Sequence, residues 1–180
     1  LRAAGLDAIV LHRTERTDFK AGALRDGVER SPHGYFAIFD VDYVPPPDFL
    51  RRAMRPLIAD PKLAFVQGRY DYLNPVENNL TEIQVVLQDA HLGVEQATRS
   101  WAGHPLPFNG TCGIWRRAAI EAAGGWRGDT LAEDLDLSYR AWLAGFHGVF
   151  LANVTAPGEL PTTFRAWMSQ QRRWTKGFSQ

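Results

Sequence analysis

The sequence predicts a single α/β domain, in which crossover helices pack against a sheet. Stretches with strand character alternate with helix-like stretches along the chain. The length of 180 residues is enough to bury one core and leaves no room for a second full domain. One strand candidate, at 35–39, is continuously apolar and aromatic, which is typical of a strand buried on both faces of a sheet.

The first half of the chain contains most of this alternation. In order, the predicted elements are a strand at 6–11, a helix at 20–30, a strand at 35–39, a helix at 48–59 and a strand at 63–67. Ala21, Leu24 and Val28 share one face of the first helix. Pro47 fits the first turn of the second helix, where its missing N–H is tolerated.

A long helix is predicted after Asn74. Its apolar residues recur every three or four positions and form one stripe: Val76, Leu80, Ile83, Leu87, Ala90, Val94 and Ala97. We expect this stripe to pack against the rest of the domain. A membrane-surface role is the alternative, which the acidic and amidic polar face disfavours.

Two further helices are predicted near the C-terminus. Thr130 and Glu133 fit a capping box that starts a helix ending at Gly145, with Leu135, Tyr139 and Trp142 on one face. The last helix covers about 162–178. It has an aromatic face and is too short and polar to span a bilayer, so we expect it to lie at a membrane interface.

Composition excludes several classes of protein. Twenty basic residues balance twenty acidic ones, so no basic excess indicates binding to nucleic acid. A single cysteine, Cys112, excludes an internal disulfide and a cysteine-based zinc site. No apolar run reaches the length of a membrane span. The first residues have neither an initiator Met nor a signal-peptide pattern, so we expect the chain to be a piece of a longer protein.

The first candidate site is Asp40-Val41-Asp42, directly after the aromatic strand. Residues two apart on a strand project to the same side, and ligands of open α/β sheets bind at the carboxyl ends of strands. Paired carboxylates suit Mg²⁺ or Mn²⁺, which such sites share with substrate phosphates. The alternative is a solvated turn before the prolines.

The second candidate site is the acidic run Glu133, Asp134 and Asp136. Carboxylates in a first helical turn are favoured by the helix dipole, so a structural role alone would explain them. Asp134 and Asp136 exceed what capping needs and lie among leucines. A carboxylate held there could serve as a general base.

Three weaker signals complete the set. Gln170, Arg173 and Trp174 fall on one face of the last helix, where an arginine can pair with diphosphate and an indole can stack on a sugar. The alternative is an ordinary amphipathic helix. Lys20 begins a helix, where phosphate binding is favourable, and the segment 108–111 supplies small residues that let backbone approach a ligand.

In this order the motifs resemble the catalytic domain of processive family-2 glycosyltransferases, which include cellulose, mannan and hyaluronan synthases. Five segments carry the resemblance: Arg13-x-x-Arg16-x-x-Phe19-Lys20-Ala21-Gly22-Ala23-Leu24, Phe39-Asp40-Val41-Asp42, Phe108-Asn109-Gly110-Thr111-Cys112-Gly113-Ile114-Trp115-Arg116, Gly124-Gly125-Trp126 with Thr130 to Ser138, and Gln170-Gln171-Arg172-Arg173-Trp174. The Asn109-Gly110-Thr111 segment and the run from Glu133 to Leu137 most resemble those of cellulose-synthase-like mannan or glucan synthases.

The resemblance implies a GT-A fold, a Rossmann-like sheet that binds a nucleotide-diphosphate sugar, here incomplete at its N-terminus. It implies inverting transfer of a hexose to a growing β-linked polysaccharide, dependent on Mg²⁺ or Mn²⁺. The roles it implies are catalytic base for Asp134, metal ligands for Asp40 and Asp42, donor or diphosphate binding for Lys20, Asp40, Gln170 and Arg173, and acceptor binding for Asn109, Gly110 and Trp174.

GDP-mannose and UDP-glucose are the donors we expect first. The family's Thr-Glu-Asp is Ala132-Glu133-Asp134 here, so a hydroxyl is absent while the expected base remains.

The resemblance also implies that residues 1–180 are a partial domain of a protein at the cytoplasmic face of a membrane, inactive or nearly so in isolation. The alternatives are a degenerate nucleotide-sugar-binding or scaffolding module and a metal-dependent nucleotidyltransferase.

Overall fold

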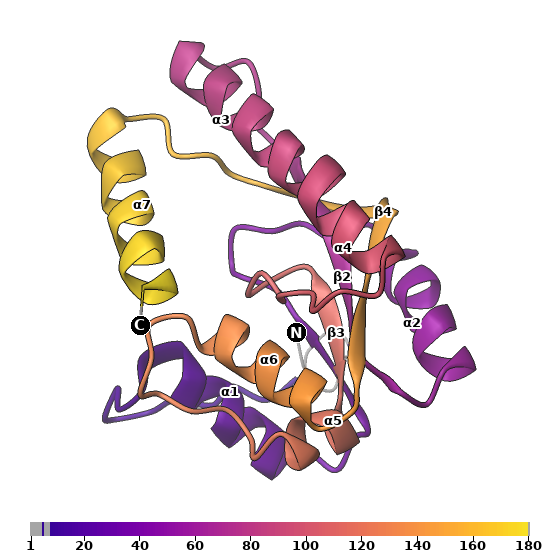
Figure 1. The fold of residues 1–180 in the computed structure, drawn as a ribbon. Coiled ribbons are helices and arrows are strands. Elements are labelled where there is room, and N and C mark those ends of the chain that lie inside the picture. The colour runs from indigo at the N-terminus through magenta and orange to yellow at the C-terminus, as the bar shows by residue number, and fades with distance from the viewer. Residues whose placement is uncertain (1–4, 6–7, 180) are drawn as a thin grey trace.

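A four-stranded mixed sheet lies at the centre of the computed structural model, which describes residue 5 and residues 8–179 (Figure 1). Its strands, in the order β1-β3-β2-β4, are β1 (Tyr35–Ile38), β3 (Gly113–Arg116), β2 (Leu63–Tyr72) and β4 (His147–Gly158). β3 runs antiparallel to both β1 and β2, whereas β2 and β4 are parallel. The predicted α/β sheet is confirmed; β3 and β4 were not predicted.

Helices cover both faces of this sheet (Figure 1). They are α1 (Phe19–Arg30), α2 (Phe49–Ala59), α3 (Asn79–Ala90), the π-helical turn η2 (His91–Gln96), α4 (Ala97–Trp101), α5 (Arg117–Ala122), α6 (Glu133–Leu143) and α7 (Phe164–Phe178). On one face, α2 packs Ala53 and Leu57 against Val66 and Ile114. On the other, η2, α5 and α6 surround an aromatic cluster of Phe65, Phe108, Trp115 and Trp126.

Most predicted elements are confirmed within a few residues, and two predictions about strands are wrong. Residues 6 and 7 of the strand predicted at 6–11 lie outside the described residues. Residues 8–11 form no strand, and the side chains of Ile9 and Val10 are 70% and 90% exposed. β1 is not buried on both faces: it lies at the edge of the sheet, Ala37 is exposed, and only Ile38 is buried.

α3, η2 and α4 form one continuous helical run, as the periodicity predicts, but most of the stripe expected to be buried is exposed, and only its last residue, Ala97, lies in the core. Ile83, Leu87 and Val94 are 53%, 55% and 66% exposed. The polar residues Thr81 and Gln84 are buried instead.

The reason lies in the segment that leads into α7, which runs along the polar side of α3. Gln84 Nε2 donates to the carbonyl of Pro161 at 2.8 Å, and Asn78 Nδ2 donates to that of Thr162 at 3.2 Å. These backbone carbonyls require hydrogen-bond donors, so the polar face turns inward.

The capping box predicted for Thr130 and Glu133 is wrong. α6 starts at Glu133 with Ala132 at its N-cap and no side-chain cap, and Thr130 Oγ1 is buried without a hydrogen-bond partner among the described residues. α7 packs over this segment, since a Cβ built on Gly177 would lie 3.1 Å from the Cβ of Ala132. Tyr139 and Trp142, expected to share a face, remain 39% and 43% exposed.

Candidate active site

Lys20 connects three segments that are far apart in the sequence. Its Nζ lies 2.6 Å from Asp40 Oδ1 and donates to the carbonyl oxygen of Gly110 at 2.9 Å. Lys20 belongs to the first turn of α1, Asp40 follows β1, and Gly110 precedes β3. A charged pair that is only partly exposed fixes the relative positions of these segments more firmly than an exposed pair would.

The two carboxylates after β1 are not equivalent. β1 ends at Ile38, so Asp40 and Asp42 lie in a turn, and the strand alternation that predicted a shared side does not apply to them. Asp40 is partly buried, and its N–H donates to Thr111 Oγ1 at 2.9 Å. Asp42 is exposed and makes no hydrogen bond or ion pair with another described residue. Lys20 therefore balances the charge of Asp40, whereas the carboxylate of Asp42 is free to bind a ligand.

Asp134 is the most perturbed carboxylate among the described residues. Burial, and to a lesser extent the neighbouring charge of Glu133, raise the pKa of Asp134 to about 6. The N–H of Leu135 donates to Asp134 Oδ1 at 2.8 Å, which partly offsets the cost of burial. A carboxyl group with such a pKa can both accept and hold a proton near neutral pH.

A glycine provides the room for this carboxylate. Gly110 has φ +81, and a Cβ built on it would lie 2.9 Å from Asp134 Oδ2 and 3.5 Å from Lys20 Nζ. The segment 108–111 thus brings bare backbone against the candidate base. The small residues of this segment predict a close approach of backbone to a ligand, and in the structure this backbone approaches Asp134.

Buried amides hold this segment in place. Gln67 Oε1 accepts from the N–H of Asn109 at 2.9 Å, and Gln96 Nε2 donates to Asn109 Oδ1 at 3.1 Å. Tyr70 donates its hydroxyl to the carbonyl of Asn109 at 2.5 Å. No motif in the sequence singles out Gln67, Gln96 or Tyr70. A polar residue inside an otherwise apolar strand, as Gln67 is, was the one signal that could have indicated a role.

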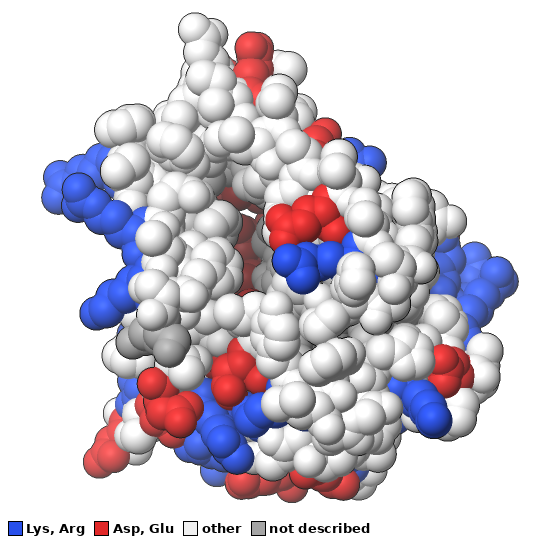
Figure 2. All heavy atoms as spheres, in the orientation of Figure 1, with Lys and Arg blue, Asp and Glu red and all other residues white. Residues whose placement is uncertain are grey.

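α7 places the remaining candidates across a hollow from the long helix. Figure 2 shows this face of the molecule hollowed, with Asp and Glu side chains visible inside. Arg173 lies close enough to Glu133 to oppose the rise that burial causes in the pKa of Glu133. Gln170 Oε1 is buried without a partner among the described residues, and the side chain of Trp174 is 37% exposed.

The structure therefore brings Lys20, Asp40, Gly110 and Asp134 together. Of the three candidates on α7, Arg173 lies near Glu133, the neighbour of Asp134. Among the described residues, no three Asp, Glu, His or Cys side chains could hold a metal ion by themselves. Cys112 is buried, and burial raises the pKa of its thiol to about 12, so it remains protonated and unsuited to act as a nucleophile.

Comparisons with known proteins identify the family of this chain. Residues 35–180 match the family described as "Glycosyl transferase family group 2". Glucomannan 4-beta-mannosyltransferase 2 from Arabidopsis thaliana is 46% identical over 168 residues, covering 92% of this chain and 32% of that protein. Glucomannan 4-beta-mannosyltransferase 1 from Cyamopsis tetragonoloba is 41% identical over 176 residues, covering 96% and 34%. The chain thus spans about a third of the length of these relatives.

A solved structure supports the fold. A mannosyltransferase from Pyrobaculum calidifontis, in complex with GDP-Man and Mn²⁺, matches 95% of this chain and 45% of its own with a TM-score of 0.71 and 22% identity. At that identity the likeness concerns the fold, and it confirms the expected GT-A architecture.

Proposed function

The chain belongs to glycosyl transferase family group 2, and from that premise we propose that it is the catalytic region of an inverting hexosyltransferase. The enzyme transfers a sugar from a nucleotide-diphosphate sugar to a growing β-linked polysaccharide. The relatives named as mannosyltransferases favour GDP-mannose as donor, with UDP-glucose next.

One observation carries the proposal. Asp134 is a buried carboxylate with a raised pKa, and it faces the backbone of Gly110, where any side chain would collide with it. Inverting transfer needs a single base that removes the proton of the acceptor hydroxyl as that oxygen attacks the anomeric carbon. Asp134 is proposed to be this base. No second acid is needed, because a nucleotide diphosphate leaves without being protonated.

The carboxylates after β1 fit a divalent ion that arrives with its substrate. Asp42 is exposed and pairs with no other residue that the structure describes, and hard carboxylate oxygens are the ligands that Mg²⁺ and Mn²⁺ prefer. Asp40 adds a second carboxylate whose charge Lys20 already balances. Because the described residues offer too few ligands to hold an ion alone, donor phosphates would complete its shell. When bound, the ion would neutralise charge on the leaving diphosphate.

The roles assigned to α7 follow its position. Arg173 is proposed to pair with the diphosphate, together with Gln170, and Trp174 to stack on the acceptor sugar. Lys20 is proposed to act on the donor side through Asp40. Asn109 and Gly110, held by buried amides, are proposed to line the acceptor position next to Asp134.

The setting of the chain in the whole protein is also a proposal. None of the described helices is long and apolar enough to cross a bilayer. α7 carries Arg165, Arg172, Arg173 and Lys176 and no acidic residue, which suits a helix lying at the surface of a membrane. We propose that residues 1–180 form part of a GT-A domain at the cytoplasmic face, and that this part alone is inactive or nearly so.

Nucleotide release by the full-length protein in membranes tests this function. GDP-mannose, UDP-glucose and UDP-N-acetylglucosamine are supplied in turn with Mn²⁺ or Mg²⁺. Turnover with one donor, abolished by a chelator and by Asp134→Asn, is expected. Asp129→Asn, an exposed carboxylate five positions upstream, is the matched control and should retain activity.

Other outcomes are equally informative. Metal-dependent donor binding without turnover would indicate a degenerate binding module, and activity that survives Asp134→Asn would favour a nucleotidyltransferase. Sugar transfer by residues 1–180 alone would contradict the proposed inactivity of this part.

A further inference from the structure

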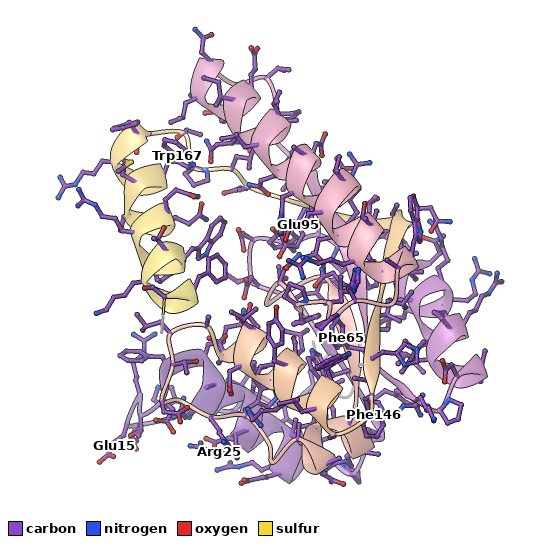
Figure 3. All side chains as sticks on the ribbon, in the orientation of Figure 1. Glu15, Arg25, Phe65, Glu95, Phe146 and Trp167 are labelled. Atoms are coloured by element: carbon purple, nitrogen blue, oxygen red, sulfur yellow. The ribbon has the colours of Figure 1, made fainter. Side chains whose placement is uncertain are left out.

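α7 presents two indoles on one side. Trp167 and Trp174 are seven residues apart, which is about 20° short of two full helical turns, so they lie almost in line along the helix. Between them, at i+3 and i+4, stand Gln170 and Gln171. Figure 3 shows Trp167 near the start of α7, on the side turned toward the rest of the molecule. Trp167 is half-buried and Trp174 is 37% exposed.

This side of α7 is held in a fixed direction by contacts at both ends. Asn78 and Gln84 bind the carbonyls of Thr162 and Pro161, just before the helix starts. At the other end Gly177 is buried against Ala132. Next to this side, α7 borders a surface depression of about 450 Å³, lined by Phe164, Arg165, Met168, Ser169 and Arg172. The ring of Phe164 packs against that of Trp167, with the ring centroids 5.7 Å apart.

The strip of α7 between the two indoles carries amides, Gln170 and Gln171. Arg173 borders this strip beside Gln170, whereas Arg165, Arg172 and Lys176 lie on the far side of the helix. Gln170 Oε1 is buried without a hydrogen-bond partner among the described residues. An unpartnered buried carbonyl is costly unless something donates to it, and a sugar hydroxyl is a suitable donor. Aromatic faces separated by amides suit a neutral sugar chain better than a phosphate or a nucleic acid.

We propose that Trp167 forms a second sugar-stacking platform, which binds the acceptor chain two sugar units away from the unit that stacks on Trp174. Seven residues of α-helix advance about 10.5 Å, which is about the length of two units of an extended β-1,4-linked hexose chain. In such a chain every second unit presents the same face, so both indoles meet equivalent surfaces. The inference rests on the proposed function, because it requires that Trp174 holds an acceptor sugar.

Binding of oligosaccharides to the purified full-length protein tests this platform directly. The probes are β-1,4-linked manno-oligosaccharides of increasing length, with cello-oligosaccharides in parallel, measured by isothermal titration calorimetry. Affinity should rise by about tenfold when the chain becomes long enough to reach Trp167 as well as Trp174, as one extra stacked ring would give. Trp167→Ala should remove this increase and leave the affinity for short chains unchanged. Trp167→Tyr should preserve it.

Controls separate a local effect from misfolding and from a failed function. Trp101→Ala removes an 81% exposed indole on α4 and should leave the length dependence intact. Unchanged short-chain affinity in Trp167→Ala shows that the variant is folded. A length dependence that persists in Trp167→Ala, an equal loss for all lengths, or no length dependence in the unaltered protein would overturn the inference. Donor turnover is measured separately, so its absence would contradict the proposed function alone.

Discussion

Gly110 and Asp134 meet at a distance that admits no side chain on the glycine. A Cβ on Gly110 would lie 2.9 Å from Asp134 Oδ2. Ser138 reinforces this arrangement, because its Oγ donates to the carbonyl of Asp134 at 2.6 Å and accepts from the N–H of Phe108 at 2.8 Å. One hydroxyl on α6 therefore fixes both the helix turn that carries the candidate base and the segment that faces it.

Gly110→Ala is expected to disturb both backbone and base. The positive φ costs a non-glycine residue about 1–2 kcal/mol, and the new methyl group displaces the Asp134 carboxylate. Since a small displacement of a catalytic group can cost about 100-fold in rate, we expect a loss of that order in nucleotide release. Gly125→Ala is the matched control, with φ +76 and nothing within 4 Å of the added Cβ. It should lose stability but keep its rate per folded molecule.

The rate should depend on pH through Asp134. Burial raises the pKa of this carboxyl to about 6, and only its ionised form can accept a proton. Activity is therefore expected to fall as the pH decreases through about 6 and to be level between about 7 and 8. A profile of kcat/KM against pH measures this. An acid limb near pH 4, the ordinary range of an aspartate, would contradict the role of the buried carboxyl.

Lys20→Met should shift that acid limb. The ammonium group of Lys20 lowers the pKa of Asp134, opposing the effect of burial. Without it the carboxylate ionises at higher pH, so the limb should move upward. The loss of the ion pair with Asp40 should also weaken donor binding. Lys62→Met, an exposed lysine at the start of the segment leading into β2, is the control and should change neither quantity. An unchanged limb in Lys20→Met would show that this electrostatic coupling is absent.

Asp134→Asn should stabilise the fold while it abolishes transfer. The native pKa is above the ordinary value, so between about pH 4 and 6 the native state binds more protons than the unfolded state. Stability therefore decreases as the pH rises through that window, and the variant, which cannot ionise, avoids this loss. We expect it to be more stable by about 2 kcal/mol at pH 8 and by less at pH 5. Denaturant unfolding at both values measures the difference. Equal or lower stability at pH 8 would argue against a destabilised buried carboxylate.

Local signals in the sequence predicted much of the fold. α1, α2, β2 and α7 lie within a few residues of their predicted ranges, because strand and helix periodicities and prolines act over short distances. Local pattern could not decide where α6 starts. There Ala132, rather than Thr130, occupies the N-cap, because the packing of α7 against this segment determines the path of the chain.

The candidate site, like the fold, could be predicted from the sequence only in part. The residue types and their order predict a base at Asp134, metal ligands at Asp40 and Asp42, and an arginine and an indole on α7, and these roles stay predictions. The sequence did not reveal that Lys20 binds Asp40, or that Gln67 and Gln96 hold Asn109, since these contacts join segments up to 42 residues apart.

The sequence by itself determined the family to which this chain belongs and where most of its helices begin and end. Only the tertiary structure decided which faces those helices bury. The stripe of Ile83, Leu87 and Val94 has a helical period whether it faces the core or solvent, and its direction depends on Gln84, which binds the carbonyl of Pro161. The pKa of Asp134 has the same origin, because burial is a property of every segment that surrounds the carboxylate and not of its neighbours in sequence.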